Sequence, residues 1–447
     1  MRNLTKISHA LAHVRESLVV VAALAATACS TERLLDAARP DFIDPGGLSG
    51  NLQGAAALYA GALGDFAVSH DGGLGTGIGI GLVVATGFMS DEFRFGGTPP
   101  EIREMDLRSV RESNGAWLQT YLDQHRTRAA ADRAAEALKA AVTGADSRIG
   151  EMYAIAAAEI ILLGEAYCAG APLGATEPEL IYGDPLSTQQ LMQAAIAKLD
   201  LAAQNTGGSA RISSLVAVLR GRALLNNAQF PQAAAAVANV PTSFAYTTLH
   251  STKTERQKLF PHNYMYNLDS WLVSDREGGN GLNFATAGDP RVPIDGDGSP
   301  SRFDQRTPRY YFRKYNGFDA SVTVASGVEA RLIEAEAALQ ASNTALWMTK
   351  LNEARAPYAM TTVTDPGAAA ARVDLMFRER AFALFATAHR VGDLRRMIRQ
   401  YSRGAETVFP TGAYHKDNLT RGSDVNIALP ISEKNNPKFT GCLNRGA

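Results

Sequence analysis

Cysteine is scarce in this sequence, which holds only three in 447 residues: Cys29, Cys168 and Cys442. So few thiols exclude a disulfide-dense scaffold, and none of them has the Cys-x-x-Cys partner that zinc and dithiol sites use. Cys168 and Cys442 lie far apart in the chain, and the sequence alone leaves open whether they pair. We expect two buried and unreactive thiols.

Net charge and catalytic motifs are also missing. The formal charge is −1 at pH 7, so no strong field draws the chain to nucleic acid, and we expect no nucleic-acid partner. The sequence contains no His-Glu-x-x-His, no Gly-x-Ser-x-Gly and no Walker loop. Among the scattered histidines, His389 lies between apolar neighbours and is expected to be structural. We therefore expect a protein that is not an enzyme; a secreted hydrolase with an unrecognised site is the alternative.

Only one long apolar run stands out, at residues 17–26, and it follows several basic residues. The run is too short to cross a bilayer as a helix, but it has the length of a signal-peptide core. Small residues then lead directly to Cys29. That order resembles a lipobox, in which the cysteine becomes the first mature residue and its thiol carries a diacylglyceryl group. We predict lipidation at Cys29; an ordinary cleaved signal with a coincidental cysteine is the alternative.

The chain divides into parts of different composition. We predict a lipoprotein signal peptide at 1–28, a lipid-anchored linker at 29–54 and a single domain at 55–447. With 46% hydrophobic and 20% charged residues, the chain has the composition of a globular protein. Region 242–323 differs from the rest of the domain, because aromatics, Gly, Asp, Asn and Pro replace an Ala-rich pattern. A long irregular insertion of this kind is unusual and often functional.

The remainder of the domain shows helical patterns. Residues 213–241 resemble a degenerate tetratricopeptide unit, in which Gly221 and Ala233 let two helices approach and Phe230 fills the groove between them. One such unit needs stacked neighbours to bury its exposed face. Apolar periodicity predicts suitable helices at 115–142, 152–167 and 186–203. We predict a mostly α fold, a tetratricopeptide-like helical repeat scaffold with an irregular, loop-rich insertion.

The C-terminal part carries the most informative motif. Residues 377–385 and 389–396 combine an apolar helical stripe with many charges and end in Asp-Leu-Arg-Arg. They resemble the charged helix of SusD/RagB-like proteins, the lipid-anchored nutrient-binding subunits of bacterial outer-membrane uptake systems. Further segments resemble motifs of that family in the same order along the chain: Met89–Phe93, Trp117 with Tyr121, Gly327–Ala337, Leu351–Ala356 and Asn426–Pro437.

The resemblance implies a function as well as a SusD-like fold. It implies a lipoprotein of the outer membrane, facing the cell surface, that captures a nutrient such as an oligosaccharide. The nutrient would pass to a TonB-dependent transporter of the SusC type, without turnover. A lipid-anchored helical-repeat scaffold for protein–protein interaction in the cell envelope is the alternative. The identity of the nutrient, and surface against periplasmic orientation, stay open.

If the ligand is an oligosaccharide, the aromatic residues of the insertion are the best candidates to bind it, in the stretches 264–271 and 310–315. Sugar rings present apolar C–H faces that stack on Trp and Tyr, while Asn, Asp and Arg bind the hydroxyls. The alternative is that these rings pack the insertion against the helical body. We predict the ligand-binding residues Tyr264, Tyr266, Asn267, Asp269, Trp271 and Arg276.

Two other charged groups have weaker ligand interpretations. Asp295 and Asp297 begin a pattern like a calcium loop, but Pro300 replaces the glycine and Arg306 the glutamate that such a loop needs. A solvated turn is therefore the main expectation, calcium is the alternative, and no other cofactor is expected. The charges of the C-terminal helix are expected to pair with one another or with nearby carbonyl groups: Glu379, Arg380, Asp393, Arg395 and Arg396.

Overall fold

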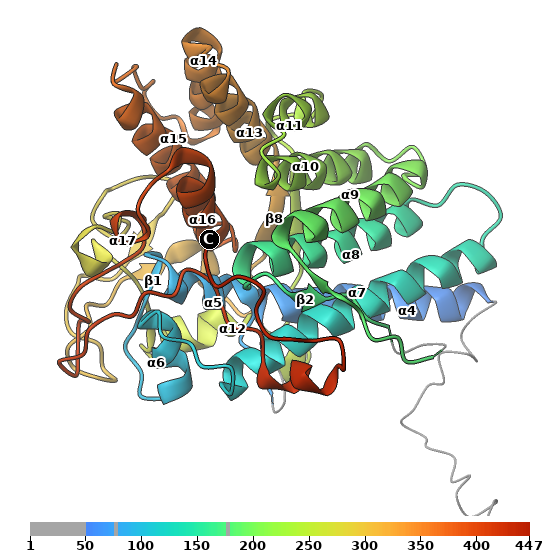
Figure 1. The fold of residues 1–447 in the computed structure, drawn as a ribbon, viewed down its shortest axis with the longest axis horizontal. Coiled ribbons are helices and arrows are strands. Elements are labelled where there is room, and N and C mark those ends of the chain that lie inside the picture. Colours follow the sequence, from blue (N-terminus) through green and yellow to red (C-terminus); the bar gives the residue numbers. More distant parts are fainter. Residues whose placement is uncertain (1–50, 76–78, 176–178) are drawn as a thin grey trace, which may run out of the picture. The chain divides into compact units, whose positions relative to one another are not determined.

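The computed structural model describes residues 51–75, 79–175 and 179–447 (Figure 1). The predicted signal peptide, Cys29 and the linker up to residue 50 lie outside these residues. The side chain of Asn51 accepts a hydrogen bond from the Gly54 amide at 2.7 Å, so a helix already begins within the last residues of the predicted linker. All described residues belong to one compact unit of the chain.

Helices of the first half of the chain pack mainly on their neighbours in sequence. Helix α7 contacts α4 and α8, α9 packs on α8, and α10 lies against α9 and α11. Figure 1 shows this stack in blue and green. The three helices and the helix pair predicted here are confirmed. The helices are α4 (Leu52–Asp71), α5 (Leu82–Met89), α6 (Pro100–Asp106), α7 (Gly115–Ala141), α8 (Ser147–Ala166), α9 (Thr188–Gln204), α10 (Ala210–Asn226) and α11 (Phe230–Val237).

Local sequence explains these elements. Ser187 and Gln190 form a reciprocal capping box at the start of α9. Between α10 and α11 the backbones approach closely, because a Cβ added at Gly221 would lie only 2.6 Å from Cγ1 of Val237. Ala233 is fully buried on the facing helix. Small residues therefore allow the predicted close packing, and the tetratricopeptide-like, mostly α fold class is confirmed.

The second half of the chain ends in another set of helices: α13 (Gly327–Gln340), α14 (Thr344–Arg355), α15 (Ala369–Ala383), α16 (Arg390–Tyr401) and α17 (Ala405–Val408). Helix α13 joins the two sets, since it packs on α11 and α10 and also on α14 and α15. None of the described helices is long and apolar enough to span a membrane.

Buried ion pairs connect these C-terminal helices. Arg380 forms two hydrogen bonds to Asp393, at 2.8 and 2.9 Å. Arg396 binds Asp393 at 2.8 Å and also the carboxylate of Glu336 on α13. Arg395 donates to three backbone carbonyls at the end of α8, at 2.7 to 2.9 Å. The predicted structural pairing of these charges is confirmed.

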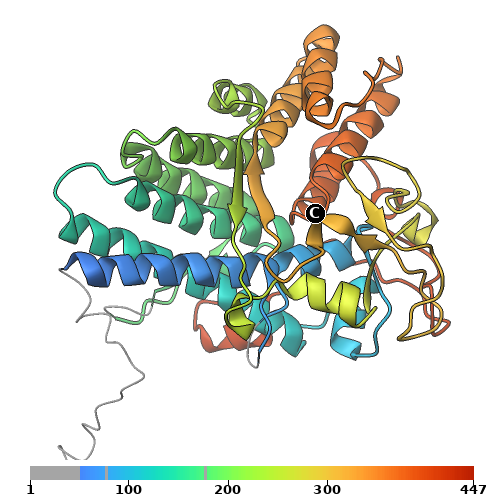
Figure 2. The ribbon, with the colours of Figure 1, turned by 180° about the vertical axis from the view of Figure 1, so that it is seen from behind.

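The predicted insertion lies between two antiparallel strands. Strand β4 pairs with β8 and brings the two ends of the insertion together; Figure 2 shows the two strands side by side as yellow-green and orange arrows. Within the insertion β6 pairs with β7, while β5 pairs with β1 from an earlier part of the chain. The strands are β1 (Phe93–Phe95), β2 (Ala171–Pro172), β3 (Pro185–Leu186), β4 (Ala245–Thr248), β5 (Trp271–Val273), β6 (Ile294–Asp295), β7 (Tyr311–Phe312) and β8 (Val322–Ser326).

Short helical turns complete the chain. The segment Asn263–Asn267 is a π-helical turn that directly follows α12 (Phe260–His262). The 3-10 turns are η1 (Glu255–Gln257), η3 (Glu277–Gly279), η4 (Arg313–Tyr315), η5 (Ala356–Tyr358) and η6 (Ile431–Asn435).

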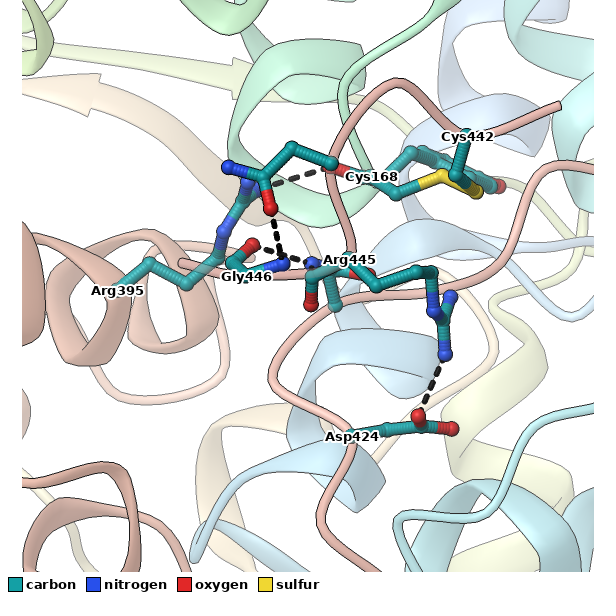
Figure 3. The surroundings of a disulfide bond; sticks show 9 residues. Cys168, Arg395, Asp424, Cys442, Arg445 and Gly446 are labelled. Atoms are coloured by element: carbon teal, nitrogen blue, oxygen red, sulfur yellow. Dashed lines mark hydrogen bonds and ion pairs between the residues drawn. A yellow bond between two sulfur atoms is a disulfide. The ribbon is translucent and has the colours of Figure 1, made fainter. Parts of the chain in front are cut away.

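Cys168 and Cys442 form a disulfide, with Cα atoms 5.8 Å apart (Figure 3). The expectation of two unreactive thiols was therefore wrong. The C-terminal segment returns to the end of α8, where the Ile427 amide donates to Ala166 O at 2.9 Å. The Leu443 amide donates to Ala169 O at 2.7 Å. Backbone pairing on both sides thus brings the two cysteines within bonding reach, which their sequence separation of 274 conceals.

Candidate ligand-binding site

Trp271 lies in the core. The side chain is 1% exposed and stacks on Tyr264, with ring centroids 4.5 Å apart and planes inclined by 19°. Phe260 and Phe88 cover it further, with centroids at 4.9 and 5.6 Å. Trp271 begins β5, whose pairing with β1 buries both strands. In this structure Trp271 packs the insertion against the helical body, which is the alternative to ligand binding that the sequence left open.

Asp269 is fully buried as well, and it organises the loop around it. Its carboxylate accepts hydrogen bonds from Arg302 Nε and from the Arg302 amide, at 2.9 and 3.0 Å, and from the Tyr311 hydroxyl. Burial favours the neutral acid, but the hydrogen bonds from Arg302 and Tyr311 outweigh it and lower the pKa of Asp269. The carboxylate therefore stays charged and fixes two neighbouring side chains.

Four half-buried rings of the insertion form a continuous series, which we call the aromatic row: Phe318, His262, Tyr266 and Tyr311. His262 contacts Phe318 edge-on at 4.6 Å between centroids and stacks on Tyr266 at 5.3 Å. Tyr266 in turn lies 4.9 Å from Tyr311. The row is built by α12 with its π-helical turn, by β7 and by the loop before β8.

Charged groups border the aromatic row. Tyr266 donates its hydroxyl to Asp295 Oδ2 at 2.9 Å, and Arg313 Nε donates to Asp295 Oδ1 at 2.6 Å. On the other side, Arg302 Nη2 donates to Tyr266 O at 3.1 Å. The side chains of Arg302 and Arg313 are 63% and 59% exposed, so both keep donors free for a ligand. Rings with mixed polar groups beside them are what a sugar requires.

The two tyrosines of the row keep their protons near neutral pH. Burial, together with the hydrogen bond to Asp295, raises the pKa of Tyr266. The pKa of Tyr311 is raised to about 12 by burial and by its hydrogen bond to Asp269. Both phenols are therefore neutral hydrogen-bond donors, and their charge does not change within the physiological pH range.

The structure thus brings only part of the predicted set together. Tyr266 belongs to the aromatic row, and exposed Asn267 lies directly beside it in the chain. Tyr264 stacks on Trp271 instead. Exposed Arg276 directly precedes η3, and within the described residues it shares no hydrogen bond, ion pair or ring contact with the row.

Sequence reasoning missed several residues of this site: His262, Phe318, Arg302, Tyr311 and Arg313. The stretch 310–315 is rich in rings and basic residues, but nothing local shows that β7 pairs with β6. That pairing sets Tyr311 beside Tyr266 from a distant part of the chain.

The two aspartates of the calcium-like pattern have separate roles. Asp295 is held by Tyr266 and Arg313. Asp297 accepts hydrogen bonds from the Ser299 amide and hydroxyl, at 3.0 and 2.5 Å, as in a solvated turn. Among the described residues, no group of three or more His, Cys, Asp or Glu side chains is placed to hold a metal ion.

His389 is 3% exposed. Its Nε2 lies 3.0 Å from Glu329 Oε1, and its Nδ1 lies 2.9 Å from Thr387 O. The expectation of a structural imidazole is confirmed.

Comparison with known proteins identifies the fold. No family model and no curated protein match the sequence. A SusD superfamily protein from Bacteroides vulgatus ATCC 8482 matches with a TM-score of 0.65 and 15% identity, over 89% of this chain and 100% of that one. A SusD-like carbohydrate binding protein from Bacteroides fragilis NCTC 9343 gives 0.65 and 14%, over 88% and 99%.

A third match is the surface glycan-binding protein A from Bacteroides thetaiotaomicron, with a TM-score of 0.65 and 11% identity, over 88% of this chain and 99% of that one. These likenesses confirm at the level of the fold what the motifs predicted. The chain has the fold of SusD superfamily proteins.

Proposed function

We propose that this protein is a glycan-binding lipoprotein of the outer membrane, which captures an oligosaccharide and delivers it to a TonB-dependent transporter of the SusC type. The observation that carries the proposal is the aromatic row with its charged border, on a SusD-like fold. An oligosaccharide presents sugar rings in series, and the row offers aromatic rings in series. Arg302, Arg313 and Asn267 stand beside the rings, where they can bind the hydroxyl groups.

Two further observations support this function. Solved proteins of the same fold are named as carbohydrate-binding or glycan-binding. The disulfide between Cys168 and Cys442 fits an exported protein, because disulfides persist in oxidising compartments such as the periplasm and the cell surface. Export also agrees with the predicted signal peptide and with lipidation at Cys29. In this proposal binding alone does the work, and no reaction is catalysed.

Substitutions in the aromatic row test the glycan site. We expect Tyr266→Ala and Tyr311→Ala each to weaken binding about tenfold or more, because each removes a stacking surface. A glycan array finds a ligand for the native protein, and calorimetric titration with that ligand measures the effect. Tyr182→Ala is the matched control, since Tyr182 is an exposed tyrosine outside the insertion, between β2 and β3. Unchanged affinity in both row variants would exclude the row as the glycan site.

The transport partner requires a separate experiment. A mild-detergent pull-down of the tagged protein from envelope membranes, followed by mass spectrometry, should recover a large β-barrel transporter in near-stoichiometric amount. Recovery of periplasmic assembly proteins instead would favour the alternative, a lipid-anchored scaffold for protein–protein interaction. Glycan binding without a transporter would leave the binding function and remove the delivery step.

A further inference from the structure

A hollow lined by residues outside the aromatic row lies where distant parts of the chain meet. Its volume is about 250 Å³. Its walls come from the β4–β8 ribbon, the start of α13, the turn η5 and the corner between α15 and α16. Drug-sized ligands occupy pockets of about 300–1,000 Å³. The hollow therefore suits one ring-sized molecule and not a chain of several sugars.

Hydroxyl groups without protein partners line this hollow. Ser243 precedes β4, Ser321 precedes β8, and Thr323 lies within β8. Ser321 and Thr323 are two positions apart in an extended segment, so they share one face. Within the described residues, none of the three side chains forms a hydrogen bond. Ser326, by contrast, is occupied, because its hydroxyl caps α13 by accepting from the Glu329 amide at 3.0 Å.

Lys314 also lines the hollow, and in the described part of the chain its ammonium group makes no ion pair. The group lies 5.6 Å from the ring centroid of Tyr358 and 5.8 Å from that of Phe312. Burial lowers the pKa of Lys314, and attraction by Asp289 offsets part of the shift. Because Lys314 is nevertheless exposed and has no carboxylate partner of its own, its ammonium group is accessible to an anionic ligand.

The other charged side chains of the wall already have partners. His389 pairs with Glu329. Arg291 binds Glu379 at 2.6 Å and Asp289 at 2.7 Å. Lys314 is therefore the charge in this wall that lacks a counter-ion within the described residues. A ligand that carried a single carboxylate would supply this missing counter-ion.

We propose that this hollow binds one small polyhydroxylated carboxylate, an acidic monosaccharide. Its carboxylate would pair with the ammonium group of Lys314, and its hydroxyls would bond to Ser243, Ser321 and Thr323. The ring of Tyr358 is half-buried at the same wall and offers an apolar face to the sugar ring. The proposal does not rest on the aromatic row or on transport, since it uses a different set of residues.

Titration calorimetry of the full-length chain in detergent tests this site, with D-glucuronate as probe and with D-glucose and acetate for comparison. We expect glucuronate to bind and both comparison compounds to bind at least about tenfold more weakly, because each lacks one half of the recognised chemistry. Lys314→Met, which keeps the apolar stem, should weaken glucuronate binding about tenfold or more. Thr323→Val should weaken it as well.

Matched variants separate this site from other effects. Lys139→Met is the control, because Lys139 also lies over a tyrosine ring, 5.9 Å from the centroid of Tyr153. Lys139 is on α7 and does not line the hollow. Tyr266→Ala tests independence from the aromatic row. Both should bind glucuronate as the native protein does. No binding at about 10 mM glucuronate, equal affinity for glucose, or native affinity in a folded Lys314→Met variant would each overturn the proposal.

Discussion

At the residue scale, Glu92 is an unusual carboxyl group because it is fully buried. Its Oε1 accepts a hydrogen bond from the Ala386 amide at 2.9 Å, and its Oε2 has no partner among the described residues. Burial raises the pKa of Glu92 to about 8, although the Ala386 amide and Arg390 favour the charged form. At neutral pH the folded protein therefore holds this side chain mostly as the neutral acid.

The raised pKa predicts that stability falls as pH rises. A glutamate in the unfolded chain ionises near 4.5 and the folded Glu92 near 8, so between these values the folded state binds more protons. The free energy of unfolding then decreases with increasing pH. Glu92→Gln mimics the neutral acid, and we expect it to stabilise the protein above pH 8 by on the order of a few kcal/mol.

Urea unfolding at about pH 5 and about pH 9 measures this difference. The native protein should lose more stability between the two conditions than Glu92→Gln does. Glu112→Gln, at an exposed glutamate, is the control and should follow the native protein. If the native protein and Glu92→Gln lose the same amount, Glu92 is not neutral in the folded state.

Neighbouring aromatic residues show where prediction from sequence ends at this scale. Trp271 and Tyr266 belong to one stretch, and composition gives no reason to separate them. The structure buries Trp271 because its strand pairs with β1, which comes from a distant part of the chain. Tyr266 stays half-buried in a π-helical turn. The residue types needed for a sugar site were thus predictable, but how far each ring is buried depends on pairing between strands.

At the scale of elements, the helices were predictable because their signal is local. Apolar periodicity and end signals such as Ser187 before α9 are contained in a few turns of sequence. The insertion lacks such signals, since its strands are only two to five residues long and pair across loops. The disulfide was hidden for the same reason, because backbone pairing near Ile427 and Leu443 is what brings Cys442 to Cys168.

The disulfide predicts how the C-terminal segment contributes to stability. It links residues separated by 274 positions, so it strongly restricts the unfolded chain, and we expect Cys442→Ser to lower the free energy of unfolding by about 4–5 kcal/mol. Urea unfolding in oxidising and reducing buffer measures the change. Reductant should bring the native protein to the level of the variant and leave the variant itself unchanged. Equal midpoints for both proteins in oxidising buffer would show that the link does not form.

At the scale of the whole molecule, the order of weak motifs was more informative than any one of them. Identities of 11–15% to the solved structures leave few matched positions, yet segments from Met89 to Pro437 follow one sequence order. Many of those positions fix packing, as the ion pairs of Asp91 with Arg390 and of Arg380 with Asp393 illustrate. The fold was therefore predictable from residues that hold it together, whereas the proposed glycan site lies in the insertion, where none of these motif segments falls.

The proposed attachment to the membrane concerns the whole molecule, and it makes a prediction about Cys29. If a lipid on this cysteine anchors the protein, Cys29→Ser should move it from the membrane fraction to the soluble fraction. Stable anchoring takes more than one acyl chain, because a single chain holds a protein only reversibly. Cys29→Ser removes the attachment point of both chains of the diacylglyceryl group, so the protein should be released fully. Fractionation with immunoblotting measures the distribution, and mass spectrometry of the N-terminal peptide detects the lipid.

Two comparisons make that experiment decisive. Cys168→Ser removes a cysteine of the disulfide and should stay in the membrane fraction, so release must depend on Cys29 and not on loss of a thiol. The released Cys29→Ser protein should keep its affinity for the glycan, because the aromatic row lies entirely within the described domain. If Cys29→Ser stays on the membrane and its N-terminal peptide shows that residues 1–28 have been removed, a protein partner holds it there. The transporter that the pull-down seeks would then carry the anchoring as well as the uptake.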